Sequence, residues 1–291
     1  MSKFKYFPSF SVAGFGQALR KNLVLRNGLT SRFYSKDFPE KYRHTEFLIS
    51  AGHFLKHADL YGEHGFTSDN LIMGDSGGFQ IASGALKWDK SLLEKVFVWL
   101  ENNSDIAMNL DIPPKMTYEG MYEECLRISK DNFKYFADKQ TGNTDFLNVV
   151  QGTNEIEYMN WYDQIKEFPF QGWAIGGGGR SIYAFMSGVL SLLNGKEHLK
   201  DSNKWLHILG ISKISDFLML NQLQKSLDEV GSKIVVTTDS SSPDRAVVFG
   251  GYYLDYDFRK ASFQSINIPK RDDTFKDQTF KYLPFYTEFD K

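Results

Sequence analysis

Side chains that could carry out chemistry follow a series of short apolar runs in the sequence. Asp75, Asp111 and Asp239 each lie at the end of such a run, and so do Gln151 and the glycine-rich turn 176–179. Two carboxylates at one site can act as nucleophile and as general acid and base at a glycosidic bond. A single aspartate at such a place is often only a helix N-cap, but three together favour a catalytic site.

The apolar runs alternate with segments that have the pattern of amphipathic helices. The expected strands lie within seven segments: 46–53, 70–78, 105–114, 145–152, 172–179, 205–212 and 233–240. Apolar residues at three-to-four spacing predict helices at 91–103, 122–139, 155–168, 181–195 and 215–231. Strands that alternate with helices form a parallel sheet. An eighth strand within 4–12 or 22–26 would close a (β/α)8 barrel, whose active site lies at the carboxyl ends of the strands.

A (β/α)8 TIM barrel is therefore the predicted fold, of the α/β class, and a doubly wound open sheet is the alternative. No expected strand is followed by a GxGxxG turn, which disfavours a dinucleotide-binding version of that alternative. We expect three parts. A basic N-terminal segment covers 1–45 and can include the first barrel strand, the barrel covers 46–257, and a short aromatic tail at 258–291 packs on the barrel.

The composition is that of an ordinary globular protein. Hydrophobic residues make up 42% and charged residues 24% of the 291 positions, which excludes a wholly disordered chain. Cys125 is the one cysteine, so an internal disulfide and a thiolate-rich zinc site are excluded, and we expect it to be a small core residue. No apolar run approaches the roughly 18 residues that span a bilayer. We therefore expect a soluble, cytoplasmic protein with no membrane partner.

The charge is unevenly distributed along the chain. The total is −2, but residues 1–45 contain nine Lys and Arg residues against Asp37 and Glu40, a local charge of +7. The remaining residues therefore sum to −9. A basic arm in front of an acidic body is typical of a patch that contacts phosphates. An ordinary solvated surface is the other interpretation.

The sequences at the strand ends resemble the motifs of the guanine transglycosylases, which exchange guanine in tRNA for a 7-deazaguanine. GDSGGFQ at 74–80 is similar to the signature of that family. The other matches follow in order: LDIPP at 110–114, VVQG at 149–152, AIGGGG at 174–179, HILGISK at 207–213 and TTDSSSPDR at 237–245. The resemblance covers roughly residues 70–250. Six collinear motifs at barrel spacing are far more specific than one.

The resemblance implies a role for each carboxylate. Asp239 matches the nucleophile that attacks C1′ and forms a covalent glycosyl intermediate. Asp75 matches the general acid/base. Asp111 matches the carboxylate that accepts hydrogen bonds from N1–H and the exocyclic amine of guanine. The chain would thus be a pentosyltransferase. Two alternative functions remain open: a barrel glycosidase that acts on sugars, and a non-catalytic partner subunit of a transglycosylase.

The resemblance also implies the groups that hold the base and the nucleic acid. Gln151 and the Gly177 N–H address the O6 and N7 edge, while Phe79 and Leu209 sandwich the ring, where stacking is worth about 1–3 kcal/mol per base. The expected base pocket also includes Ser76, Gly176 and Gly178. The expected contacts with the nucleic-acid backbone are Arg245, Lys213 and Arg180. Because the base must leave the stack, the substrate is a flipped or unpaired guanosine.

This chain departs from the tRNA enzymes at its C-terminal end. Those enzymes carry a zinc site of three Cys and one His after the last strand, but here no Cys follows Cys125 and no His follows His207. We therefore expect no zinc and no other cofactor. A compact, zinc-free chain looks more like the bacteriophage branch, which inserts 7-deazaguanines of the preQ0 or preQ1 type into DNA and so evades restriction. DNA is the expected partner and tRNA the alternative. The zinc region supports dimerisation in the tRNA enzymes, so a monomer is compatible with its absence.

Three histidines of the N-terminal half invite a metal-site interpretation. His53 and His57 have HxxxH spacing, and His64 follows seven residues later. No acidic residue occupies the second position of an HExxH motif, and histidines are common in loops and on helix faces. The sequence therefore predicts no metal here, and contact with the substrate backbone is the alternative role.

Overall fold

The computed structural model describes residues 4–10, 28, 32–57, 59–114, 121–177, 182–242, 251–257, 259–260 and 262–267. The chain divides into two compact units, Met1–Asp244 and Arg245–Lys291. Within the first unit, eight parallel strands form a closed barrel. They are β1 (Lys5–Phe10), β2 (Glu46–Ser50), β3 (Leu71–Asp75), β4 (Ile106–Met108), β5 (Asp145–Val150), β6 (Gly172–Ile175), β7 (Trp205–Ile208) and β8 (Val235–Ser240).

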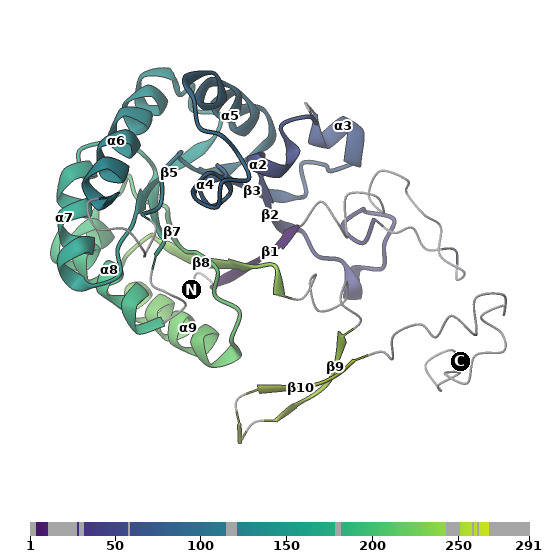
Figure 1. The fold of residues 1–291 in the computed structure, drawn as a ribbon. Coiled ribbons are helices and arrows are strands. Elements are labelled where there is room, and N and C mark those ends of the chain that lie inside the picture. Colours follow the sequence, from purple (N-terminus) through teal and green to yellow (C-terminus); the bar gives the residue numbers. More distant parts are fainter. Residues whose placement is uncertain are drawn as a thin grey trace. The chain divides into compact units, whose positions relative to one another are not determined.

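Helices connect the strands and cover the outside of the barrel. The five long ones are α5 (Lys90–Asn103), α6 (Met121–Lys139), α7 (Glu155–Ile165), α8 (Ile182–Asn194) and α9 (Ile214–Glu229), which surround the strands (Figure 1). The shorter ones are α2 (Ala51–Phe54), α3 (Leu60–His64), α4 (Gly78–Ala82) and the 3-10 turns η1 (Glu40–Tyr42) and η3 (Glu197–Leu199). The predicted (β/α)8 fold is confirmed, and all five predicted helices are present.

The barrel closes through the N-terminal strand. β1 pairs in parallel with β8, from Lys5 beside Thr237 to Pro8 beside Ser240, and it pairs with β2 on its other side. The eighth strand thus lies within the first of the two stretches proposed for it, and the barrel begins well before residue 46.

The observed strands are shorter than the apolar segments that predicted them. The segment 105–114 contributes only Ile106–Met108 to the sheet. The chain then turns, with the Asp111 N–H donating to the Asn109 carbonyl over 3.1 Å. Pro113 and Pro114 follow, and neither has an N–H to donate to a sheet ladder. Asp111 and Gln151 therefore lie beyond the sheet, whereas Asp75 and Asp239 are still part of their strands.

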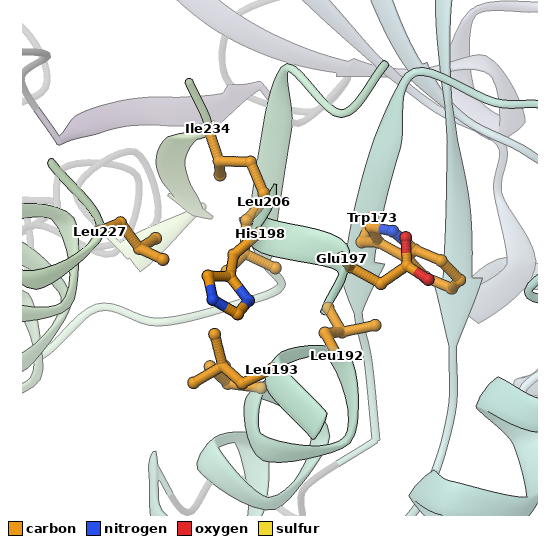
Figure 2. Close-up of a pocket in the computed structure, with 9 residues that line it drawn as sticks. Trp173, Leu192, Leu193, Glu197, His198, Leu206, Leu227 and Ile234 are labelled. Atoms are coloured by element: carbon orange, nitrogen blue, oxygen red, sulfur yellow. The ribbon is translucent and has the colours of Figure 1, made fainter. Parts of the chain in front are cut away.

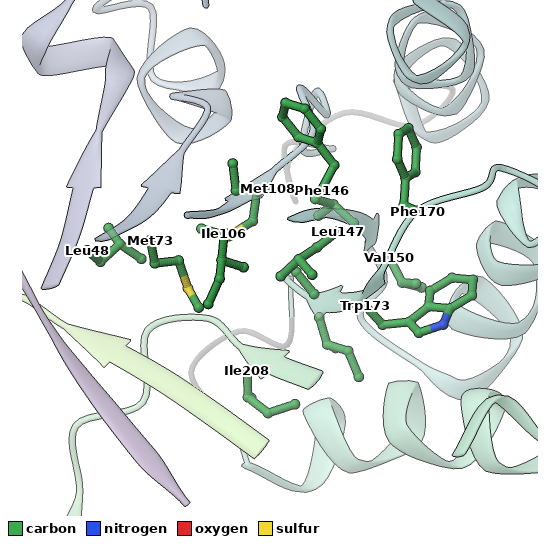
Figure 3. Close-up of a cluster of buried hydrophobic side chains, with 14 of the residues drawn as sticks. Leu48, Met73, Ile106, Met108, Phe146, Leu147, Val150, Phe170, Trp173 and Ile208 are labelled. Atoms are coloured by element: carbon green, nitrogen blue, oxygen red, sulfur yellow. The ribbon is translucent and has the colours of Figure 1, made fainter. Parts of the chain in front are cut away.

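The strands are buried because helices cover the sheet from outside and side chains fill the inside. Figure 3 shows one cluster of buried side chains from β2 to β7, among them Met73, Ile106, Leu147 and Ile208. Each such side chain contributes roughly 1.5–3 kcal/mol when it is fully removed from water. Cys125 on α6 is buried and free of a disulfide, which confirms its expected place in the core.

The second unit contains an antiparallel hairpin of β9 (Gly251–Asp257) and β10 (Ser262–Asn267). The sequence-based boundary placed 251–257 inside the barrel, and this is corrected. The barrel is already closed by β1 and β8, so it offers no free sheet edge that a further strand could join. Residues 268–291, which hold most of the expected aromatic tail, lie outside the described residues. Among the described helices, none has the length and apolar character to cross a membrane.

Candidate active site

The predicted site residues lie at the carboxyl ends of the barrel strands. Asp75 is the last residue of β3, and Asp239 is the last but one of β8. Asp111 follows β4 by three residues, and Gln151 follows β5 directly. Because all eight strands are parallel in one closed barrel, these four side chains belong to the same end of it.

Asp75 is half-buried and is not a helix cap. The N-cap of the following helix, α4, is Gly77, and no side chain caps that helix. Burial raises the pKa of Asp75 above its ordinary value, and the negative charge of Asp239 raises it further. The nearby Ser50 hydroxyl, the Gly77 N–H and His53 act in the opposite direction. A carboxyl group with a raised pKa is suited to carry a proton in catalysis.

Two glycines let α4 approach the site closely. Gly77 has a φ of 90°, and a Cβ at this position would lie 3.0 Å from the Cα of Gly52. A Cβ on Gly78 would lie 2.7 Å from the carbonyl oxygen of Asp111. Gly77 therefore lets the β3 loop approach α2, and Gly78 lets it approach the Asp111 turn. The next residue, Phe79, is 75% exposed, so its ring is available for stacking.

Asp111 and Gln151 form a buried polar pair. Gln151 Nε2 donates to Asp111 Oδ2 over 2.7 Å, and both side chains are buried. The pKa of Asp111 is raised to about 7, chiefly by burial. The Gln151 hydrogen bond opposes this increase, and the charge of Asp75 adds to it. The carboxyl group therefore changes its protonation state close to neutral pH.

The turn after β6 packs against this pair. A Cβ on Gly176 would collide with the side chain of Gln151, so a larger residue there would displace Gln151 from Asp111. The Tyr158 hydroxyl donates to the Gly176 carbonyl over 2.7 Å and fixes the turn. Gly177 has a φ of 86° and is exposed. Its glycine identity follows from this left-handed backbone conformation.

Asp239 is nearly buried and is held from three directions. Its Oδ1 accepts from the Gly210 N–H over 2.8 Å and lies 3.3 Å from His207 Nε2, while Oδ2 accepts from the Ser9 hydroxyl over 3.1 Å. These partners come from β1, from β7 and from the loop after β7. A carboxylate has about four acceptor positions, and the described residues occupy three of them, which leaves one for a substrate. The arrangement fixes the orientation of a potential nucleophile.

His207 is fully buried and also contacts the hydroxyl of Thr237, with 2.8 Å between Nδ1 and Oγ1. One neutral tautomer satisfies both contacts: Nε2–H donates to Asp239, and Nδ1 accepts from the Thr237 hydroxyl. His207 therefore links the backbone of β7 to the carboxylate on β8. Phe7 packs edge-on to the imidazole, with 6.5 Å between the ring centroids.

The other predicted residues have different environments. Ser76 is buried, and its hydroxyl has no hydrogen-bond partner among the residues described. Leu209 is half-buried, and its N–H donates to the Ile175 carbonyl over 3.0 Å. Lys213 is exposed and directly precedes α9. Gly178, Gly179, Arg180 and Arg245 lie outside the described residues.

Sequence reasoning gave no role to several residues that the fold brings to the site. Ser9, Ser50 and His207 contact or approach the carboxylates, and Gln80 Nε2 lies 3.0 Å from His53 Nε2. His207 and Gln80 lie within the motifs, so their position was a usable signal. Ser9 and Ser50 carry no local signal, because their contacts depend on strand pairing.

No protein-family model matches this chain, and no curated protein matches it either. Its function is therefore inferred from the site itself and from the motifs of the strand ends.

A cavity elsewhere in the barrel is a packing void. It has a volume of about 10 Å³ and is lined by side chains of β6, β7, α8, η3 and α9, including Trp173, Leu192 and Leu206 (Figure 2). Trp173 and Leu206 are paired near the amino ends of their strands, away from the carboxyl ends. A volume of this size holds at most about one water molecule. It therefore offers no second ligand site.

Proposed function

We propose that this protein is a guanine transglycosylase that replaces guanine in DNA by a 7-deazaguanine. The observation that carries the proposal is the buried Asp111–Gln151 pair at the same barrel end as Asp75 and Asp239. A carboxylate beside a carboxamide presents acceptors and a donor, which complement the edge of guanine. An enzyme that cleaves bonds between sugars needs two carboxylates but no such base-reading pair.

In the first half of the proposed reaction, a carboxylate oxygen of Asp239 attacks C1′ of a flipped guanosine. The C1′–N9 bond breaks, its electron pair goes to the guanine, and Asp75 gives the departing base a proton. The Gly210 N–H, Ser9 and His207 hold the nucleophile in place. The products are a covalent aspartyl-glycosyl intermediate and free guanine.

In the second half, a 7-deazaguanine takes the place of guanine against Asp111 and Gln151. Asp75, now ionised, removes the proton from N9, and this nitrogen attacks C1′ and releases Asp239. Two inversions at C1′ give overall retention. The raised pKa of Asp75 supports its role as the proton carrier in both directions.

Phe79 and Leu209 are the proposed stacking partners of the base, and the exposure of the Phe79 ring supports this. Gly177 and Gly178 would approach the O6 and N7 edge, with Ser76 beside them. Lys213, Arg180 and Arg245 are the proposed contacts to phosphates. The proposed reaction transfers protons and electron pairs only among the two bases, the nucleic acid, Asp75 and Asp239.

DNA is proposed as the substrate because the chain has no Cys after Cys125 and no His after His207. Residues 240–291 therefore supply none of the cysteine ligands of the zinc site that the tRNA enzymes carry after the last strand. In the bacteriophage branch that the chain resembles, the exchange protects DNA from restriction, and we propose the same role here, in the cytoplasm of a host cell. A tRNA substrate is the alternative outcome.

Incorporation of radiolabelled guanine separates these substrates. The purified protein is incubated with labelled guanine and either duplex DNA or total tRNA, and precipitated counts are measured. We expect label in DNA with the wild type and none with Asp239→Asn. Label only in tRNA would overturn the DNA assignment, and release of unlabelled base without incorporation would favour a glycosidase.

A further inference from the structure

Three side chains of the β2–β3 connection form a cluster apart from the carboxylates of the barrel end. His57 follows α2, and Glu63 and His64 are the last two residues of α3. One potential ligand atom from each lies within 4.8 Å of the other two. The sequence predicted no metal here because no acidic residue occupies the second position of an HExxH motif, but the fold brings Glu63 to His57.

The backbone on both sides of this cluster is anchored to the core. Trp99 of α5 donates from Nε1 to the His57 carbonyl over 2.8 Å, and the Tyr34 hydroxyl donates to the His64 carbonyl over 2.6 Å. The Asp59 side chain caps α3 by accepting from the Gly62 N–H over 2.9 Å. Both histidines are therefore held by contacts that do not involve their rings.

The three side chains differ in burial in a way that suits a metal site open to water on one side. His64 is fully buried, His57 is partly buried, and Glu63 is exposed. The two imidazole rings lie with 5.4 Å between their centroids, and Phe54 packs against both. Glu63 Oε2 lies 2.7 Å from His57 Nδ1.

We propose that His57, Glu63 and His64 bind a divalent transition-metal ion, with Zn²⁺ as the best match. Zinc sites built from two histidines and one glutamate take a water molecule as fourth ligand. Ligand atoms around a tetrahedral zinc lie about 3.3 Å apart, between the shortest and the longest separations in this cluster. Because Glu63 is exposed, a rotation of its side chain can adjust the geometry.

Imidazole nitrogen favours zinc, copper, iron and nickel over the hard cations, which prefer sites made only of oxygen. All three ligands come from residues 57–64, so the ion would join α3 to the segment after α2. We infer a structural clamp on the β2–β3 connection. The clamp is independent of the proposed transglycosylase reaction.

Direct metal binding tests the proposal on the full chain. The protein is stripped with EDTA, dialysed and titrated with ZnCl₂ by calorimetry, and with Co²⁺ while the visible spectrum is recorded. We expect one ion per chain, with the intense visible bands of four-coordinate Co²⁺. A hundredfold excess of free Zn²⁺ over its Kd should raise the Tm by about 5 °C.

Substitutions of Glu63 and His57, which are more accessible than His64, test the site with little risk of a folding defect. Glu63→Gln and His57→Asn should each weaken Zn²⁺ binding about tenfold or more and remove the Co²⁺ bands. Glu167→Gln, which removes an exposed carboxylate after α7, should bind like the wild type. No Zn²⁺ binding by the wild type, or equal Kd values for the wild type and Glu63→Gln, would overturn the proposal.

Discussion

Nε2 of His207 lies 3.3 Å from Oδ1 of Asp239, and Nδ1 of the same imidazole, which is fully buried, contacts Thr237. The Gly210 N–H donates to the same carboxylate oxygen. Two groups from the β7 region thus set the orientation of Asp239, while the Ser9 hydroxyl holds its other oxygen. In the proposed reaction His207 is accordingly a positioning residue, because it would act on the nucleophile Asp239 and not on the base.

We expect His207→Leu to lower kcat about 10- to 100-fold, since Asp239 and Thr237 would each lose a buried partner worth roughly 1–3 kcal/mol. KM for the incoming base should stay nearly constant. His207→Gln offers a side-chain N–H near the same place and should restore most of kcat. Steady-state kinetics of both variants, with thermal melts as a control, check this. Equal kcat values for His207→Leu and the wild type would remove the positioning role.

Asp111→Asn should weaken guanine binding at least tenfold, because an amide can present a donor where guanine presents one. Guanine affinity, measured by equilibrium dialysis, tests this expectation. Gln151→Glu is a useful companion variant, since it places a second acid against Asp111 and should also weaken binding. Unchanged guanine affinity in Asp111→Asn would exclude Asp111 from base recognition.

The same substitution should stabilise the protein above neutral pH. The pKa of Asp111 is raised to about 7 from an ordinary value of 3.8. The folded state therefore holds this proton more tightly than the unfolded state. The resulting stabilisation is complete below the ordinary pKa and is lost as the pH rises through 7. Asp111→Asn avoids that loss and should gain roughly 1–4 kcal/mol at pH 8 but less than half as much at pH 5, as urea unfolding would show.

Guanine affinity should depend on pH through Asp111. The ionised carboxylate accepts hydrogen bonds from guanine, whereas the protonated form must first lose its proton. Below its pKa of about 7, affinity should therefore fall about tenfold for each pH unit, and above it affinity should level off. Titrations between pH 5.5 and 8 measure this. Asp75→Asn should move the midpoint to lower pH, because the charge of Asp75 raises the pKa of Asp111. An affinity that is constant or decreases over this range would contradict the account.

The sequence was sufficient for the fold because a parallel barrel leaves a strong periodic record. Each buried strand is an apolar run, and each helix shows three-to-four spacing. The residues at which the strands and the barrel end were harder to predict. Pro113 and the turn at Asp111 end the sheet after Met108. The predicted barrel boundary at 257 included residues 251–257, although the pairing of β1 with β8 already closes the barrel.

The site divides in the same way. Asp75, Asp111, Gln151 and Asp239 could be found because each ends an apolar run. The contact of Ser9 with Asp239 joins residues 230 positions apart and depends on the pairing of β1 with β8. Glu63 was overlooked because a short helix, and not a sequence motif, brings it to His57. Contacts across the barrel or between short loops leave no periodic signal.

The covalent intermediate at Asp239 is the central claim, and trapping it is the most direct measurement. The protein is incubated with guanine-containing DNA, denatured without reduction and analysed by intact-mass spectrometry and peptide mapping. We predict a protein–DNA adduct located on the peptide that contains Asp239. Asp239→Ala should form no adduct while it still binds guanine with nearly wild-type affinity. An adduct that persists in Asp239→Ala would contradict the account and make Asp75 the next candidate for the nucleophile.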